Sequence, residues 1–137
     1  MRRAIGYAAG VPEATVRDVM TPIRVACPAD ATLRDAAAAM TEAGVGALVV
    51  DADRPAIISE RDLLRPIAAG LDLDTERVVD HVRANRPGAQ PAESLIAVSA
   101  RMSEQNVRHV LVMEGSAAVG MLSMRDVVRV IGRVAGA

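Results

Sequence analysis

Apolar positions in the first half of this chain recur with a helical period. Between residues 33 and 40 they fall at i, i+3, i+4 and i+7, which predicts a helix with one apolar face. Thr32 is placed to cap the start of that helix, with Asp35 three residues later. Gly44 is placed to end it in a left-handed turn.

Short continuous apolar runs follow this helix and predict strands. In the first half we expect an extended piece at 23–26, the helix from Thr32, strands at 47–50 and 56–58, and a helix at 59–68. In the second half we expect an extended piece at 88–90, a helix at 94–105, strands at 109–113 and 118–122, and a helix at 123–134. Each half therefore has the order strand–helix–strand–strand–helix, which is an α/β pattern.

The two halves are copies of one another. A shift of 62 residues places Asp18 on Asp80, Leu33 on Leu95, Met40 on Met102, Glu42 on Glu104, Val45 on Val107 and Val50 on Val112. After two inserted residues near 116–120 the shift becomes 64, and it places Ser59 on Ser123, Arg61 on Arg125, Asp62 on Asp126 and Arg65 on Arg129. So many matches in one order indicate a duplicated unit.

The duplication sets the expected domain boundaries. The first repeat covers residues 15–70, a polar connecting segment 71–77, and the second repeat 78–134, with an N-terminal tail at 1–14. One such unit is too small to bury the apolar face of its sheet alone. We therefore expect the two repeats to pack against each other.

Composition narrows the function classes. Hydrophobic residues make up 51% of the chain and the net charge is −1, which fits neither a disordered chain nor a general nucleic-acid binder. The only aromatic residue is one Tyr, so stacking of bases on aromatic rings is excluded. A bound base must lie between aliphatic side chains and backbone.

The sequence predicts a cytoplasmic protein. A single cysteine, Cys27, forms no internal disulfide, which suits a reducing compartment. The apolar run at 4–11 follows two arginines but is broken by two glycines, and it is too weak for a secretion signal. No stretch of eighteen apolar residues predicts a membrane span.

Three short motifs resemble those of the CBS domain family. Residues 16–22, VRDVMTP, are similar to the segment that leads into a CBS domain, commonly V-x-D-V-M-T. Residues 56–62, AIISERD, and 120–126, GMLSMRD, resemble the family signature G-h-h-S/T-x-x-D. We call 16–22 and its counterpart 78–84 the leading segments. Two signatures at repeat spacing make the resemblance specific.

The resemblance implies a tandem pair of CBS repeats packed as a pseudo-twofold Bateman module, of the kind without an attached domain. Such modules are typically non-catalytic sensors that bind AMP, ADP, ATP, adenosine or S-adenosylmethionine in clefts between the repeats. No cofactor is required, and the adenine nucleotide is a regulatory ligand. Two modules commonly form a homodimer that acts on a regulated protein, which the sequence does not identify.

The resemblance also implies which residues bind the ligand. The signature Asp accepts hydrogen bonds from the ribose hydroxyls, and the Ser three residues earlier adds a polar contact. One cleft then contains Ser59 and Asp62, and the other contains Ser123 and Asp126. The other candidates are Thr21, Pro22, Ile23, Ala47, Ile57, Arg83, Arg108, His109, Gly120 and Met121.

The two clefts are not expected to be equivalent. The resemblance places Arg108 and His109 opposite Asp62, where basic residues of the family reach phosphates. The matching positions opposite Asp126 are uncharged, Gly46 and Ala47. We expect phosphorylated adenosine to prefer the Asp62 cleft, and the other cleft to take a nucleoside-like ligand or stay empty.

This sequence departs from the family pattern at the Asp62 cleft. Ala56 replaces the signature glycine, where its methyl group is placed to crowd an adenine, and residues 82–83 replace Met-Thr of the leading segment. Arg108 is equally well explained as a surface or salt-bridge residue.

Each Ser-x-x-Asp also has a purely structural interpretation. At the start of an apolar helix this pattern is a capping box, which exists with or without a ligand. The two roles are compatible, since the Asp can face a cleft while the Ser caps the helix.

Enzyme and metal functions have little support. The chain has no Gly-rich phosphate loop and no Ser–His–Asp set at positions that the repeat supports. The only soft metal ligands are Cys27, His81 and His109, too few for a zinc site.

A ligand-free dimeric interaction module remains the alternative. The apolar helix faces that suit a self-dimer are Leu63, Leu64 and Ile67 in one repeat and Val127, Val130 and Ile131 in the other, although the same residues equally suit a core.

Overall fold

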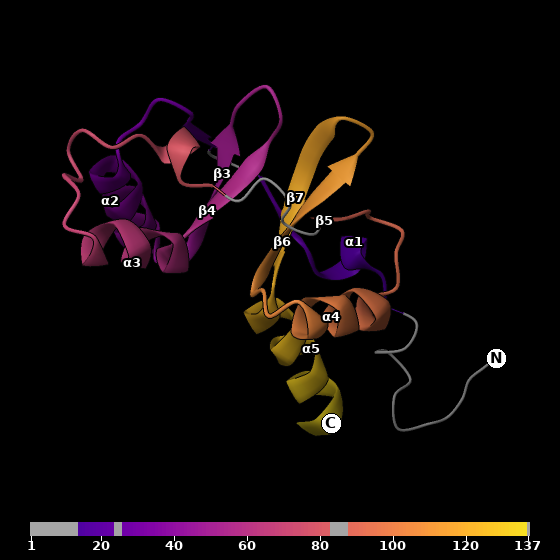
Figure 1. Cartoon of the computed structure of the whole chain (residues 1–137). Helices are drawn as coiled ribbons and strands as arrows, with labels where there is room; N and C mark the ends of the chain where they lie inside the picture. The colour runs from indigo at the N-terminus through magenta and orange to yellow at the C-terminus, as the bar shows by residue number, and fades with distance from the viewer. Residues whose placement is uncertain (1–13, 24–25, 83–87, 137) are drawn as a thin grey trace. The chain divides into compact units, whose positions relative to one another are not determined.

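The chain divides into two compact units, which we describe separately. The computed structural model describes residues 14–23, 26–82 and 88–136 (Figure 1). One unit is Ile23–Arg86, and the other combines Met1–Pro22 with Pro87–Ala137. Each unit thus contains most of one repeat together with the leading segment of the other.

Unit Ile23–Arg86 is built around a three-stranded sheet. The strands are β2 (Ala26–Pro28), β3 (Ala47–Asp51) and β4 (Ala56–Ser59), in the order β2-β3-β4, with β2 parallel and β4 antiparallel to β3. The helices are α2 (Leu33–Ala43) and α3 (Glu60–Ala68), and a short 3-10 turn, Val78–Asp80, comes from the second leading segment. The core contains Cys27, Leu33, Ala36, Met40, Val50, Ile58, Leu63 and Val78.

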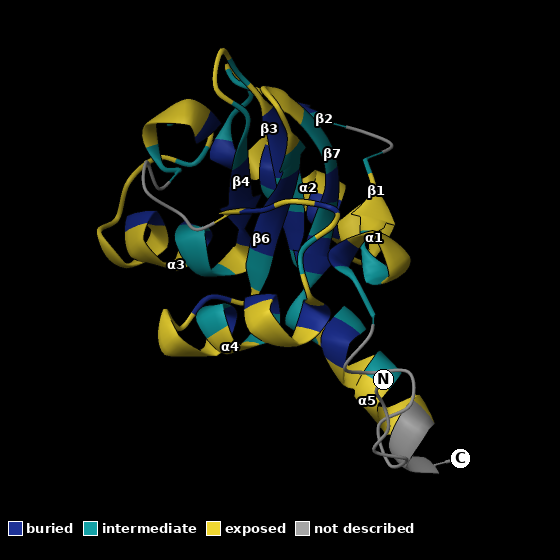
Figure 2. Cartoon of the chain, turned by 90° about the vertical axis from the view of Figure 1, so that its right-hand side faces the viewer, coloured by how far each residue is buried: buried dark blue, intermediate teal, exposed yellow. Residues whose placement is uncertain are grey.

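The other unit has a four-stranded sheet. Its strands are β1 (Thr21–Pro22), β7 (Ala117–Ser123), β6 (His109–Glu114) and β5 (Gly88–Ala89), in that order. Its helices are α1 (Val16–Val19), α4 (Leu95–Glu104) and α5 (Met124–Gly136). The core contains Val16, Ala89, Leu95, Val98, Met102, Val107, Val110, Val112, Leu122 and Val127. Figure 2 shows exposed residues along the outer side of α4 and buried residues along β6.

The predicted α/β fold and its element order are confirmed. Thr32 caps α2 with Asp35 in a reciprocal capping box, and Gly44 ends the helix at φ +69°. In the second repeat Asn106, at φ 54°, stands at the position of Gly44, because Asn tolerates the left-handed region better than most residues. Of the extended piece expected at 23–26, residues 24–25 lie outside the described residues; strand β2 begins at Ala26 and continues to Pro28, with buried Cys27 paired with Val50.

The second leading segment and the end of the connecting segment before it are bound to the first repeat by backbone hydrogen bonds. The amide of Val78 donates to the carbonyl of Ala31 (2.8 Å), and the amide of Leu33 donates to Glu76 (3.0 Å). The first amides of a helix lack partners within the helix, so the carbonyl of Glu76 satisfies a donor at the start of α2. Val78 is fully buried, and such burial stabilises by about 1.5–3 kcal/mol.

The first leading segment is bound to the second repeat in the same way. The amide of Val16 donates to Glu93 (3.0 Å), and the amide of Leu95 donates to Ala14 (2.9 Å). All four residues are the repeat counterparts of those above, at the shift of 62. The two repeats therefore exchange their leading segments, which explains why the compact units differ from the repeats in sequence.

The connecting segment is part of the unit Ile23–Arg86. The carbonyl of Leu73 accepts a hydrogen bond from the amide of Arg34 (3.0 Å), and the Arg34 side chain forms an ion pair with Asp74. The sequence of this segment is polar and has no apolar periodicity. Backbone hydrogen bonds and ion pairs, more than apolar contacts, hold most of the segment in place.

Gly120 allows the first leading segment to lie close to β7. In β1, Thr21 pairs with Met121 and Pro22 with Gly120. A Cβ atom on Gly120 would lie 2.7 Å from the Met20 sulfur and 3.0 Å from the Thr21 carbonyl oxygen. The counterpart of Gly120 is Ala56, and the residues that correspond to β1 there, 83–84, lie outside the described residues.

We expect Gly120→Ala to lower the free energy of unfolding by about 1–3 kcal/mol, because the new methyl group pushes on the backbone of β1. Gly132→Ala is the matched control. A Cβ there meets no atom within 4 Å, and alanine in helix α5 should raise stability by about 0.5–1 kcal/mol. Urea unfolding of both variants measures the difference, and an unchanged midpoint for Gly120→Ala would contradict the packing argument.

Candidate functional site

The signature residues of the first repeat form the start of helix α3. The Ser59 amide donates to Asp62 Oδ2 (2.8 Å), and the Ser59 hydroxyl donates to the same oxygen (2.9 Å). The Asp62 amide donates back to Ser59 Oγ (3.4 Å). Ser59 is only 5% exposed, so this buried hydroxyl is satisfied by the cap. The structural interpretation of the Ser-x-x-Asp pattern is therefore correct for this pair.

The second signature forms the same arrangement before α5. The Ser123 amide donates to Asp126 Oδ2 (3.1 Å), and the Asp126 amide donates to Ser123 Oγ (3.1 Å). Thr32 and Asp35 make a reciprocal box of the same kind at α2, where no ligand role is expected. Reciprocal capping alone thus identifies a helix start, and any binding role must rest on what surrounds the carboxylate.

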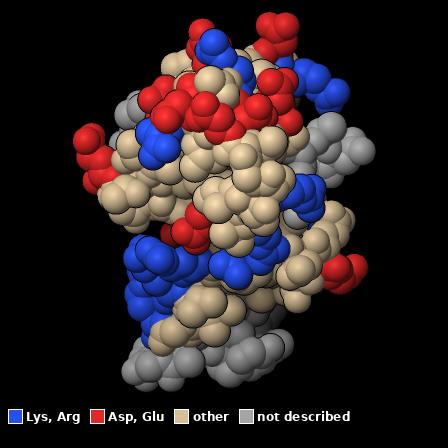
Figure 3. Space-filling view, turned by 60° about the vertical axis from the view of Figure 1, so that its left-hand side comes forward, with Lys and Arg blue, Asp and Glu red and all other residues tan. Residues whose placement is uncertain are grey.

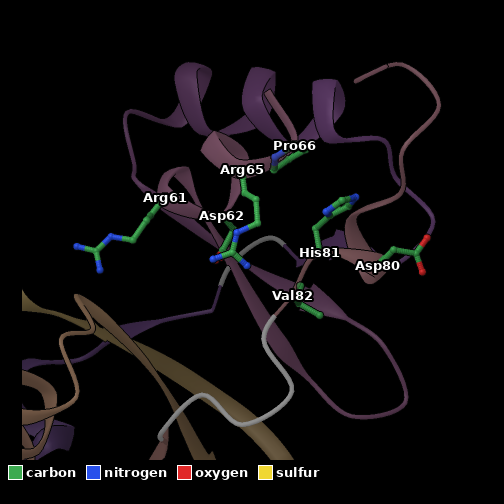
Figure 4. A pocket seen from close by; sticks show the side chains of 7 residues that line it. All are labelled: Arg61, Asp62, Arg65, Pro66, Asp80, His81 and Val82. Atoms are coloured by element: carbon green, nitrogen blue, oxygen red, sulfur yellow. The ribbon is translucent and has the colours of Figure 1, made fainter. Parts of the chain in front are cut away.

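Asp62 lies in a pocket of about 520 Å³ within the unit Ile23–Arg86. Helix α3 lines it with Arg61, Asp62, Arg65 and Pro66, and the second leading segment lines it with Asp80, His81 and Val82 (Figure 4). The volume is in the range of small-molecule sites. Residues of the second leading segment therefore lie beside the signature Asp of the first repeat.

Charges of both signs line this pocket. Two arginines and two aspartates contribute, together with one histidine. In Figure 4, Arg61 and Asp80 extend outward on opposite sides of the group. His81 Nε2 lies 2.8 Å from Glu76 Oε1 in a half-buried pair. The face drawn in Figure 3 carries a cluster of acidic side chains and a cluster of arginines.

Several predicted residues of the second site share one unit. Thr21 and Pro22 pair with Met121 and Gly120 on β7, three residues or fewer from Ser123. Among the described residues, no side chain or amide donates to Asp126 Oδ1. Its Oδ2 alone serves the cap.

Arg108 and His109 lie beside the signature of their own repeat. His109 pairs with Ser123, and the Arg108 carbonyl accepts a hydrogen bond from the Met124 amide (2.8 Å). In the first repeat Ala47 pairs with Ser59, and the Gly46 carbonyl accepts from Glu60 (2.9 Å). The predicted correspondence of these positions is thus visible in the structure.

The remaining candidates are placed as follows. Ile57 and Ala47 are buried in the sheet of the unit Ile23–Arg86, and Ile23 is half-buried at its start. Arg83 lies outside the described residues. Arg108 and His109 belong to a different unit from Asp62, so their approach to it stays a prediction.

The sequence prediction missed Arg61, Arg65, Pro66, Asp80, His81 and Val82 as pocket residues. A signal for the arginines was present, because Arg61 and Arg65 are one helical turn apart beside the signature Asp. A signal for His81 was also present, because the repeat counterpart is the apolar Val19.

Cys27 is a core residue. Its side chain is buried, and burial raises the pKa of the thiol, with a smaller contribution from the Asp35 carboxylate. A neutral buried thiol packs as a small apolar group and is a poor nucleophile.

The described residues also contain no group of three or more His, Cys, Asp or Glu side chains suited to a metal ion. None of the helices in the described part of the chain is long and apolar enough to cross a membrane.

Comparison with known proteins assigns the family. The sequence model of the CBS domain matches residues 16–69 and again residues 80–133, which together are most of the chain. The chain belongs to the CBS domain family. The predicted resemblance and the predicted α/β fold of tandem CBS repeats are thereby confirmed.

A curated relative supports the CBS assignment. The mitochondrial CBS domain-containing protein CBSX3 of Arabidopsis thaliana is 33% identical over 113 residues. The match covers 77% of this chain and 55% of the relative, so the chain spans about half the length of that protein.

Solved structures of CBS proteins resemble this chain over most of its length. Hypoxic Response Protein I, crystallised with two coordinated zinc ions, is 30% identical with a TM-score of 0.72, and the match covers 85% of this chain and 98% of that one. A CBS domain protein from Pyrobaculum aerophilum, complexed with AMP, is 29% identical with a TM-score of 0.74, covering 90% and 100%. A hexameric CBS-CP12 protein from bloom-forming cyanobacteria is 25% identical with a TM-score of 0.75, covering 84% and 69%.

Proposed function

We propose that this CBS-domain chain is a non-catalytic regulatory module that binds an adenine-containing ligand. The observation that carries the proposal is the pocket beside Asp62, which the signature helix and the exchanged leading segment form together. The AMP complex of the Pyrobaculum aerophilum protein supports the ligand class. A cytoplasmic location stays a prediction, and the Arabidopsis relative is mitochondrial.

The chemistry of the signature Asp allows capping and ligand binding together. An ionised carboxylate has about four lone-pair sites on its two oxygens. The capping boxes use Oδ2 of Asp62 and Oδ2 of Asp126. Capping through one oxygen does not by itself prevent a carboxylate from accepting hydrogen bonds from vicinal ribose hydroxyls, and such charge-assisted bonds are stronger than neutral ones.

The rest of an adenine nucleoside fits the aliphatic character of the site. The pocket at Asp62 offers Pro66 and Val82 as apolar walls, and none of the described residues that line it is Phe, Tyr or Trp. Base recognition then depends on packing against these side chains and on backbone groups, as the aromatic-poor composition predicts.

The chain offers little for catalysis. Its one cysteine is buried with a raised pKa, and the described residues hold no cluster suited to a catalytic metal. A module that binds a ligand and regulates a partner protein needs neither a reactive cysteine nor a catalytic metal. We therefore propose a module without enzymatic activity.

A dimeric interaction module is the second candidate, and exposed apolar side chains favour it. On α3, Leu64 is 63% exposed and Ile67 is 52% exposed, and on α5, Val128 is 60% and Ile131 is 46% exposed. Leu63 and Val127 belong to the cores, and Val130 packs against its core, so only part of the predicted faces is available for a partner. A second copy of the chain is the simplest cover for such faces.

We expect calorimetric titration to detect binding of AMP, ADP, ATP, adenosine or S-adenosylmethionine, and we expect Asp62→Asn to weaken it at least about tenfold. Asn keeps the capping acceptor and removes the charge. Asp35→Asn is the matched control, because it changes the same box position at α2, away from the pocket. Asp126→Asn tests the second site. No binding of any compound to the folded protein contradicts the sensor proposal and favours the interaction module.

We propose that phosphorylated adenosine prefers the Asp62 site and that the Asp126 site takes a nucleoside-like ligand or stays empty. Arg108→Ala should then weaken AMP about tenfold and adenosine far less, because a guanidinium contacts phosphate and not ribose. Titration of both ligands measures this difference. Equal losses for the two ligands contradict the asymmetry.

Light scattering after size exclusion should give twice the 14.3 kDa mass of one chain. Leu64→Glu should reduce that mass to the monomer, because a charge in an apolar interface is costly to desolvate. Val45→Glu is the control, since Val45 is an exposed apolar residue outside the helices. A monomeric wild-type protein contradicts the dimer.

A further inference from the structure

The pair formed by Glu76 and His81 is the feature that distinguishes the Asp62 pocket from its counterpart in the other repeat. At the shift of 62, Glu76 corresponds to Ala14 and His81 to Val19. Ala14 and Val19 are half-buried apolar residues that pack against the core of their unit. Glu76, at the end of the connecting segment, and His81, in the second leading segment, are both polar, and their side chains meet at 2.8 Å. Two coupled exchanges of apolar for ionisable side chains at one pocket indicate a function for the pair.

The backbone holds this pair in place. The Glu76 carbonyl accepts from the Leu33 amide, and the His81 amide donates to the Val78 carbonyl (3.0 Å). Val78, between them, is fully buried. The two side chains therefore extend from a fixed turn, with 17% of the His81 side chain and 34% of the Glu76 side chain exposed.

The protonation state of His81 decides the charge of the pocket lining. Arg61 and Arg65 balance Asp62 and Asp80, so the lining is formally neutral with a neutral imidazole and carries one positive charge with a protonated one. Glu76 binds His81 from the connecting segment without lining the pocket. The other three charged residues of that segment have partners other than His81: Asp74 pairs with Arg34, Arg77 donates to the Asp30 carbonyl, and Asp72 Oδ1 accepts from the Asp74 amide.

We propose that the Asp62 pocket holds a phosphate-type dianion and that protonation of His81 strengthens its binding. Arg65 supplies a permanent charge, and His81 supplies one that depends on pH. A protonated imidazole donates from both ring nitrogens, so one nitrogen can keep the bond to Glu76 while the other donates to the anion. The anion site is argued from the pocket alone. Only the identification of the anion as the phosphate of an adenine nucleotide rests on the proposed function.

The direction of the pH effect follows from linkage. An anion favours the protonated imidazole, so binding takes up a proton and the affinity for the anion rises as the pH falls. The site at Asp126 has Val19 at the corresponding position and should show no such dependence. The pH response is thus specific to one of the two sites.

The first test uses sulfate, which stays a dianion at every pH used, and follows its binding by NMR titration of backbone amides. We expect shifts at residues 61–66 and 80–82, with an affinity about fivefold to tenfold higher at pH 5.5 than at pH 8. His81→Gln keeps a hydrogen-bond donor for Glu76 and should abolish the pH dependence. Arg65→Ala should weaken sulfate at both pH values, and Arg129→Ala, its counterpart in the other repeat, should leave binding at the pocket unchanged.

Adenosine and AMP, titrated in parallel, separate this proposal from the proposed function. Sulfate binding that depends on His81, without binding of either adenine compound, supports the anion site and overturns the sensor. Adenosine binding at Asp62 without sulfate binding supports the sensor and overturns the anion site. No binding of any probe overturns both, and a pH dependence that persists in His81→Gln overturns the role of His81.

Discussion

The exchange of leading segments is the constraint on which both units depend. A helix start inside a core must find acceptors for its first amides, since unpaired buried amides are costly. Here the Glu76 carbonyl serves Leu33 of α2, and the Ala14 carbonyl serves Leu95 of α4. The same short segments bury Val78 and Val16 completely. Each repeat therefore needs the chain of the other to finish its fold, and each signature carboxylate has a foreign segment in its own unit.

The capping boxes join this constraint to the chemistry of the family. A Ser-x-x-Asp motif fixes the helix start and orients a carboxylate in the same step, because one oxygen of Asp62 is held by two donors of Ser59. A preoriented carboxylate loses little entropy when a ligand binds. The box at Thr32 and Asp35 has the same two reciprocal backbone bonds, and neither residue lines the Asp62 pocket. Asp62 is a candidate ligand residue because the second leading segment lines a pocket beside it, and not because it caps a helix.

Much of this organisation was predictable from local patterns. Helical periodicity located α2 to within a residue. As predicted, Thr32 and Asp35 cap its start, and Gly44 ends it in the left-handed region. The internal repeat predicted that Gly46 and Arg108 occupy equivalent positions, and both carbonyls accept a bond from the next helix. The pocket residues His81 and Arg65 were missed because the sequence does not show that residues 80–82 return to the start of helix α3, where the two segments line one pocket. The role of Gly120 was likewise invisible, since it follows from the path of β1.

The exchanged segments also bear on how such a chain could arise. A single repeat lacks the segment whose backbone pairs with the start of its first helix, so a repeat expressed alone would have to take that segment from a second molecule. Duplication placed the donor on the same chain, which replaces a bimolecular encounter by a local one at high effective concentration. It also freed the two leading segments to diverge. Val19 packs against a core, whereas its repeat counterpart is His81. In a symmetric pair of identical chains, one substitution changes both positions at once, so the two sites cannot differ in this way.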